Sequence, residues 1–324
     1  MQTLKLGTRG SQLALVQAHS VADLLRERAG VACEIVVIRT SGDRLAEATL
    51  SEIGGKRLFV KEIEDALLSG EIHLAVHSSK DMPAVLPEGL ALGAVLPRED
   101  PRDAVVLPAD EGAALSLEDL VERLGRSPRI GTSSVRRSAQ LTRLFPGAQF
   151  LPVRGNLGTR LAKVDARSDF DALVLAAAGL KRLQHEARIS AVLPVDACVP
   201  APGQGIIAVE VRAGDDRVLA ALAAIGDAPA AAALTAERAV VTHLGGGCQM
   251  PIGAYAAVAD GELAMTAIVV SVDGAQAARA EARGPVAAAH AIGIQAAEQL
   301  LARGAGAILA DVQRAHGAVE GLQP

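Results

Sequence analysis

Residues 96–106 read LPREDPRDAVV, two prolines within dense charge followed directly by an apolar run. Such a segment is typical of a connection between domains, because prolines and charged residues interrupt regular elements before the chain enters a core again. A second proline-rich passage, LPVDACVPAPGQG, spans residues 193–205 and leads into a predicted strand, IIAVEVR, at 206–212. With 324 residues the chain is too long for one ordinary core, so two or three domains are expected.

Strands and helices alternate on both sides of the first passage. Before it, the sequence predicts strands at 3–8, 33–40 and 73–77 and helices at 11–28 and 61–70. After it, PRIGTSS and QFLPVRG (149–155) precede predicted helices at 134–144 and 156–166, and a strand follows at 171–179. This alternation predicts α/β units with a parallel sheet covered by helices.

The C-terminal third has a different pattern. A helix at about 229–243 is followed by strands near 252–259, 262–271 and 276–284 and by a helix at 286–303. The Asp260-Gly261 and Asp273-Gly274 pairs are turn signals between these strands. We therefore expect an α+β unit built on an antiparallel meander.

Composition narrows the function classes. Half of the residues are apolar and the net charge is −5, which is globular composition and argues against a general nucleic-acid binder. Three cysteines with no zinc-like spacing, and histidines without metal spacing, predict no metal site and a reducing compartment. No targeting segment or membrane span is visible, so a cytoplasmic location is expected. Local arginine clusters in an acidic chain suggest a small anionic ligand.

Three predicted strand–helix junctions carry arginines. In TRGSQLAL, Arg9 precedes Ser11 at an N-cap position. In GTSSVRR, the Ser/Thr cluster caps a helix whose first turn holds Arg136 and Arg137. In RGNLGTR, Arg154 ends a strand, Asn156 can cap the next helix, and Arg160 lies in its first turn. Free N–H groups at helix N-termini attract anions, and open α/β sheets bind ligands at the carboxyl ends of their strands. One such junction could be a cap beside a solvated arginine, but all three together favour a carboxylate- or phosphate-rich ligand.

Two further motifs could carry chemistry. HSSKDMP (77–83) places Lys80 and Asp81 after a strand, either as a structural ion pair or as a carboxylate that handles protons and stabilises a cation. LGGGCQMPIG (244–253) sets Cys248 among glycines, where it is either a small apolar filler or a reachable thiol. No dinucleotide fingerprint and no phosphate-binding G-x-x-x-x-G-K-[ST] loop is present.

The order of these motifs resembles the hydroxymethylbilane synthase (porphobilinogen deaminase) family. The matching stretches are TRGSQLAL, GGKRLFVKEIE, AVHSSKDMP, REDPRDA, GTSSVRR, RGNLGTRL, AAAGLKRL, APGQG, TAERAV and GGGCQMPIGAYA. The resemblance implies two periplasmic-binding-type α/β lobes joined by a double crossover and a smaller C-terminal α+β domain. It implies the boundaries 1–98 plus 206–223 for domain 1, 102–199 for domain 2 and 224–324 for domain 3.

The resemblance also implies a covalent cofactor and a reaction. In the family, a cysteine matching Cys248 holds dipyrromethane through a thioether, and four porphobilinogen units are added with loss of ammonia before water releases hydroxymethylbilane. Asp81 matches the catalytic aspartate, which would stabilise the cationic azafulvene formed when ammonia leaves. The resemblance also implies that the protein is a monomer. Its only expected partner is the substrate porphobilinogen, and no binding to nucleic acid or to a membrane is expected.

The family motifs also assign the other site residues. The positions expected to hold the cofactor with Cys248 are Lys80, Asp81, Thr132, Ser134, Arg136, Arg137, Arg154 and Gly155. Those expected to bind substrate are Arg9, Ser11, Arg154, Arg160 and Gln204. Residues 44–57, which include Lys56, match a mobile lid, and Phe59 just after them could stack on pyrroles or be a core residue. Ser79 and Glu52 depart from residues common in relatives.

Two rival classes remain open at this point. A non-catalytic two-lobed binding protein for an anionic metabolite would explain the arginines, but neither the glycine-flanked Cys248 nor Asp81 among cations. A thiol-dependent acyl transferase would need a histidine–carboxylate arrangement beside the cysteine. His243 is near in sequence, but glycines leave its geometry undefined.

Overall fold

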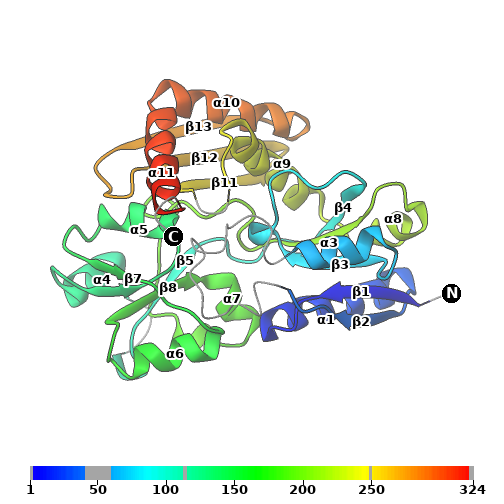
Figure 1. Ribbon diagram of the computed structural model, residues 1–324, viewed down its shortest axis with the longest axis horizontal. Coiled ribbons are helices and arrows are strands. Elements are labelled where there is room, and N and C mark those ends of the chain that lie inside the picture. The colour runs from blue at the N-terminus through cyan, green and yellow to red at the C-terminus, as the bar shows by residue number, and fades with distance from the viewer. Residues whose placement is uncertain (1–2, 41–59, 112–114, 248–249, 321–324) are drawn as a thin grey trace.

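The computed structural model describes residues 3–40, 60–111, 115–247 and 250–320, without the side chains of 316–320. Two five-stranded sheets and one three-stranded sheet define three parts of the molecule. In Figure 1 the three-stranded sheet and its helices lie above the other two parts, which sit side by side. Within the described ranges no helix combines the length and the apolar run that a bilayer crossing requires.

The first lobe is built on the sheet order β2-β1-β3-β10-β4. Its strands are β1 (Leu4–Thr8), β2 (Cys33–Val37), β3 (Leu74–Ser78), β4 (Leu90–Val95) and β10 (Ile207–Arg212). Helices α1 (Gln12–Ala29) and α8 (Asp216–Leu222) bury one face, and α3 (Lys61–Leu68) buries the other. The strand after the second proline-rich passage therefore inserts between β3 and β4.

The second lobe has the order β7-β6-β8-β5-β9. Its strands are β5 (Asp103–Val106), β6 (Arg129–Gly131), β7 (Gln149–Leu151), β8 (Ala172–Ala176) and β9 (Ala191–Val192). Its helices are α4 (Leu117–Leu124), α5 (Val135–Thr142), α6 (Leu157–Asp165) and α7 (Ala177–Arg182). Helix α7 contacts α1 of the first lobe, so the lobes touch directly (Figure 1).

The expectation of purely parallel sheets is wrong. β1 pairs in parallel with β2 and β3, and β6 with β7 and β8, but β10 runs antiparallel to β3 and β4. β5 is likewise antiparallel to β8 and β9. The reversed strands are the ones that follow a crossing between lobes, because such a strand enters its sheet from the edge where the parallel strands end.

The third part is the predicted α+β unit. β11 (Ile252–Ala259), β12 (Glu262–Val270) and β13 (Ala277–Pro285) form the antiparallel meander. α9 (Ala228–His243) and α10 (Ala289–Ala302) pack against it, and α11 (Ala305–Glu320) follows. The predicted architecture of two α/β lobes joined by a double crossover, plus a smaller C-terminal α+β domain, is thus confirmed.

Several predicted elements differ in extent, among them the strand expected at 33–40, which ends at Val37. The strand expected at 171–179 ends at Ala176, where the alanine-rich continuation turns into α7. The helix expected at 286–303 begins with a 3-10 turn at Val286–Ala288 before α10. Alanine favours helix and adds no β-branched packing surface, which explains the early end of β8.

Candidate active site

Two of the sequence motifs meet at the carboxyl edge of the first sheet. β1 and β3 are parallel neighbours, so the residues after β1 (Arg9 and Ser11) and after β3 (Asp81) share one edge. All three line a small cavity of about 60 Å³. Ser11 caps α1 as predicted, since its hydroxyl accepts a hydrogen bond from the Ala14 N–H at 3.3 Å.

The other two motifs meet at the equivalent edge of the second sheet. Ser134 caps α5 by accepting from the Arg137 N–H at 3.4 Å, and the Thr132 hydroxyl accepts from the Ser134 N–H at 3.2 Å. Asn156 caps α6, as the sequence indicated. The following turn is closed by Arg160, whose Nε donates to the Gly155 carbonyl at 2.9 Å, with Gly155 at a φ of 103°.

Electrostatic interactions join the two edges across the lobes. Burial, and after it the positive charge of Arg137, lower the pKa of Lys80 to about 8 against the opposing effect of Asp81. Burial also lowers the pKa of Arg160, again with a contribution from Arg137 and against Asp81. Cations from both lobes are therefore crowded around one carboxylate.

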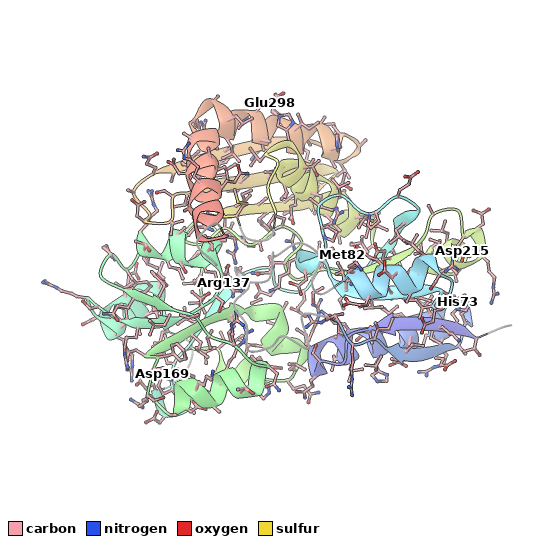
Figure 2. The ribbon with its side chains drawn as sticks, in the orientation of Figure 1. His73, Met82, Arg137, Asp169, Asp215 and Glu298 are labelled. Carbon is pink, nitrogen blue, oxygen red and sulfur yellow. The ribbon has the colours of Figure 1, made fainter. Side chains whose placement is uncertain are left out.

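Figure 2 gives the position of this cluster. Arg137 of the second lobe and Met82, the residue after Asp81, lie in the central region of the molecule, whereas Asp169 and His73 lie toward the outer parts of their lobes. Arg137 and the turn that precedes Met82 thus lie on the sides of the lobes that face each other.

Asp103 is the counter-ion that sequence reasoning missed. It is fully buried at the start of β5, and its carboxylate accepts from Arg136 Nη1 at 2.8 Å and from Arg137 Nε at 2.9 Å. Burial alone would raise its pKa, but the charges of Arg136 and Arg137 and hydrogen bonds from Arg136 and Gln204 hold it well below its usual range. The fold brings Asp103 to these arginines from 33 and 34 positions away.

Arg136 and Arg137 differ in what else they contact. Arg136 Nη1 also donates to the Val199 carbonyl at 2.7 Å, and its side chain is 5% exposed. Arg137 Nη1 donates to the Val174 carbonyl at 3.0 Å, and its charge acts on Lys80 and Arg160. Arg136 therefore points into the second lobe, while Arg137 connects Asp103 with the cation cluster.

Gln204 lies in the second crossing and is 1% exposed. Its amide nitrogen donates to the Pro101 carbonyl at 2.7 Å and to Asp103 Oδ1 at 2.9 Å. This residue, expected to bind substrate, ties the two crossings to the arginine–Asp103 cluster.

The second crossing also contacts the turn that carries Lys80 and Asp81. The Ser79 N–H donates to the Ile206 carbonyl at 3.0 Å, and a Cβ on Gly203 would lie 2.5 Å from the Ser79 hydroxyl oxygen. The turn carrying Lys80 and Asp81 is thus packed directly on the second crossing.

A further buried group joins the crossings to the third domain. Glu237 of α9 accepts from Arg98 Nη1 at 2.5 Å, from the Gly203 N–H at 2.6 Å and from the Ala256 N–H at 2.8 Å. Arg98 also lies 4.9 Å from the ring centroid of Tyr255. All three parts of the molecule therefore meet at this ion pair.

Three predicted site residues, Lys56, Phe59 and Cys248, lie outside the described residues. The two described cysteines are poor nucleophiles, because burial raises the pKa of Cys33 to about 11 and that of Cys198 to about 12. Cys198 is fully buried, and its thiol donates to Asp103 at 3.3 Å.

This fold and site define a two-lobed α/β protein with a cationic site between its lobes. A family model described as "Porphobilinogen deaminase, dipyromethane cofactor binding domain" matches residues 4–220, and one described as "Porphobilinogen deaminase, C-terminal domain" matches 231–302. The chain therefore belongs to the porphobilinogen deaminase family, and it binds dipyrromethane as its cofactor.

Curated relatives support this placement over nearly the whole chain. The chain is 48% identical over 308 residues to a porphobilinogen deaminase of Syntrophotalea carbinolica, covering 95% of each chain. It is 47% identical over 322 residues to that of Moorella thermoacetica, covering 99% of this chain and 100% of the relative. With that of Bordetella parapertussis it shares 49% identity over 313 residues, covering 96% and 97%.

Proposed function

We propose that this chain carries out its reaction between the two α/β lobes, with Asp81 as the catalytic carboxylate and Cys248 as the attachment point of dipyrromethane. The activity is that of a hydroxymethylbilane synthase, a transferase of tetrapyrrole biosynthesis. The observation that carries the site assignment is the cation cluster around Asp81, to which both lobes contribute. The binding-protein alternative is not favoured.

The residues present fit a polycarboxylate pyrrole cofactor. Arg137 is close enough to Lys80 and to Arg160 for its charge to lower the pKa of each, and Arg136 and Arg137 share one carboxylate, Asp103. Such a cluster favours added negative charge, which the acetate and propionate groups of each pyrrole would provide. When bound, the cofactor supplies the free pyrrole carbon to which the first porphobilinogen is joined.

Asp81 is placed for two tasks. It is exposed at the cavity edge, so a pyrrole N–H can reach its carboxylate. A negative charge there stabilises the positive charge that develops on a substrate pyrrole as ammonia leaves. Ammonia leaves first, from the protonated aminomethyl group; once the new carbon–carbon bond has formed, the same oxygen can accept the proton lost from the pyrrole carbon and release it to solvent.

The remaining assigned residues bind and orient. Ser11, Thr132 and Ser134 lie at helix starts, where hydroxyl and N–H groups can receive carboxylates. Arg9, Arg154 and Arg160 would hold the growing chain, and Gly155 lets its backbone approach closely. Arg136 and Gln204 act behind these groups, because both are buried against Asp103.

Cys248 is favoured as the attachment residue because the other two thiols are unsuited to alkylation. The experiment is the intact mass of the denatured protein followed by peptide mapping. We expect an adduct of two linked pyrroles on the peptide containing Cys248. Cys248→Ser should fold without it, and Cys33→Ser, the matched control, should retain it; an adduct elsewhere overturns the assignment.

The role of Asp81 is tested separately. Asp81→Asn keeps the size and most hydrogen bonds of the side chain but removes its charge, so we expect turnover to fall by roughly 10²–10³-fold. The mass assay should still show the attached cofactor, formed slowly. Near-normal turnover of this variant would contradict the assignment.

The remaining expectations concern the whole protein. We infer a cytoplasmic monomer, consistent with the free thiols of Cys33 and Cys198, and domain boundaries at the two proline-rich crossings near 96–106 and 193–205. Sedimentation velocity tests the monomer. The boundaries are tested with residues 102–199 expressed alone, which should form a folded, protease-resistant domain if they are correct.

A further inference from the structure

A second cavity lies between the first lobe and the third domain, and the site assigned above does not use it. It is a groove with a volume of about 760 Å³, lined on one side by the edge strand β4 and on the other by helix α9. These two elements contact each other directly (Figure 1). None of the described residues that line this β4–α9 groove also lines the Asp81 cavity. Small-molecule sites commonly have volumes of roughly 300–1,000 Å³ and lie at domain interfaces, so the groove has the size and the place of a binding site.

The walls of the groove are mostly aliphatic. The β4 side is formed by residues 92–95, Leu-Gly-Ala-Val, and the α9 side includes the small residues Ala228, Ala231 and Ala239. Because these alanines extend little from the helix, space remains over the strand. Val85, which is 68% exposed, also lines the groove. Among the described lining residues there is no Phe, Tyr or Trp to stack on an aromatic ring, so an aliphatic chain is the better match for this surface.

The groove is long and narrow. Its lining residues on α9 run from Ala228 in the first turn to Thr242 in the last. At 1.5 Å per residue these two positions are about 21 Å apart along the helix axis. The volume is therefore spread over several helical turns, which suits an extended chain better than a compact ring system.

Charged groups make the two ends of the groove unlike. Asp227 caps the start of α9, where its carboxylate accepts from the Ala230 N–H at 2.8 Å. Arg238 lies about three turns further along the helix, and its Nη2 donates to the Ala84 carbonyl at 2.7 Å. Because Arg238 and Ala84 both line the groove, this bond holds the guanidinium at its wall.

His290 of α10 belongs to the half of the groove that contains Arg238. It lies within one turn of Gly293, where an added Cβ would overlap the Ala236 carbonyl oxygen and lie 2.7 Å from the Ala239 Cβ. Helices α9 and α10 thus touch beside Arg238, and His290 lines the groove there. Guanidinium and imidazole nitrogens favour an anion in this half, whereas the carboxylate of Asp227 repels one at the other end.

We propose that the β4–α9 groove binds an elongated aliphatic monocarboxylate, with its carboxylate at Arg238 and His290 and its chain along β4 toward the start of α9. One anionic group and a long apolar body match one cationic end and an aliphatic channel. The binding is noncovalent, and it does not depend on the role of Asp81.

Decanoate is the probe, and isothermal titration calorimetry of the cofactor-loaded enzyme is the first measurement. We expect saturable binding of one decanoate per chain. Thr235 lines the groove, is exposed, and bonds through its hydroxyl to the Ala231 carbonyl of its own helix. Thr235→Phe should therefore fill the groove without disturbing the core, and weaken binding by roughly tenfold or more. Ser20→Phe is the matched control, because Ser20 is exposed on α1 and its hydroxyl makes the same bond to the Val16 carbonyl; it should bind decanoate as the wild type does.

The role of charge is tested with 1-decanol, which has the same chain without the carboxylate. The wild type should bind it roughly tenfold more weakly than decanoate. His290→Gln, a change at an exposed position, should weaken the binding of decanoate but not of decanol. Equal affinity for the acid and the alcohol, no saturable binding, or equal binding by Thr235→Phe and Ser20→Phe overturns the inference. If decanoate does not bind and Thr235→Phe alone lowers kcat, the groove gives the third domain room to move, and the inference is likewise overturned.

Discussion

The pKa of Lys80 shows most directly how the charge cluster affects the stability of the folded protein. Its pKa of about 8 lies below the value of 10.5 for an unperturbed lysine because the folded protein buries it near Arg137. Between these two pH values the unfolded chain binds a proton that the folded protein does not. Folding stability contributed by this residue therefore rises as the pH rises from about 8 to about 10.5, and below this window the full cost of a buried charge is present.

This leads to a prediction for protein without cofactor, prepared as Cys248→Ser. We compare its free energy of unfolding with that of the same protein carrying Lys80→Met. The difference between the two should shift in favour of Lys80 as the pH rises from 8 to 10.5, and it should stay constant below pH 7. Urea unfolding at four pH values measures this. Parallel curves throughout would contradict the charge crowding, and Lys61→Met, at an exposed site, is the control.

At the scale of single residues, the sequence predicted where side chains lie better than it predicted their hydrogen-bond and ion-pair partners. The caps at Ser11, Ser134 and Asn156 followed from residue type and spacing, because capping is local. The partner of Arg136 could not be predicted in this way. Asp103 reaches Arg136 because it lies on β5, and the sequence pattern does not distinguish this strand from the crossing before it. Rules based on neighbouring residues predict which side chains lie at the edge of a sheet. They do not predict which of these charges is paired with a carboxylate from a distant strand.

At the scale of elements, the second crossing determines where the Asp81 turn sits. Gly203 has a φ of 74°, and an added Cβ would lie 2.5 Å from the Ser79 hydroxyl oxygen and 3.0 Å from its Cβ. Both the backbone conformation and the close approach require glycine here. A displacement of this contact would move the turn that holds Asp81.

Gly203→Ala should therefore lower kcat by roughly ten- to a hundredfold, as a small misplacement of a catalytic group does. Gly214→Ala is the matched control, since its φ is 79° but no atom lies within 4 Å of an added Cβ. It carries the same backbone strain, about 1 kcal/mol, without the contact. Steady-state kinetics and melting curves of both variants separate the two effects; equal losses of kcat would disprove the coupling.

Another prediction at this scale concerns the Arg98–Glu237 ion pair. Arg98→Met leaves the fully buried Glu237 without its cation, which should cost about 3–5 kcal/mol of stability. Arg129→Met breaks a more exposed pair, with side chains 36% and 41% exposed, and should cost about 1 kcal/mol or less. Chemical denaturation compares them, and similar losses would show that the buried pair does not hold the third domain to the crossings.

The order of elements was more predictable than their direction. Periodicity and turn residues gave β1, α1, α9 and the three strands of the meander close to their observed bounds. The antiparallel direction of β5 and β10 was not predictable in this way, because a strand's direction depends on where the connecting chain enters the sheet. The proline-rich segments indicated where the chain crosses between lobes. They did not indicate from which edge of the sheet the strand after each crossing would enter.

At the scale of the whole molecule, the structure has three parts that meet around one cationic site. The lobes contact each other through α1 and α7, and Glu237 fixes the third domain to both crossings. Asp81 and Asp103 offset only part of the positive charge of Lys80, Arg137 and Arg160, so the cluster opposes this assembly until a further anion binds. An anionic cofactor attached from the third domain and held by both lobes should therefore stabilise all three parts together.

The final prediction follows from this arrangement. Cofactor-loaded protein should melt at a higher temperature than Cys248→Ser, by roughly 2–4 °C for each kcal/mol of binding free energy. In the loaded protein, Arg160→Gln should reduce that gain by removing a contact to the bound carboxylates. In the Cys248→Ser background the same substitution should be neutral or stabilising, because it relieves repulsion from Arg137. Differential scanning calorimetry of the four proteins measures both effects, and an equal loss in the two backgrounds would place Arg160 outside the cofactor site.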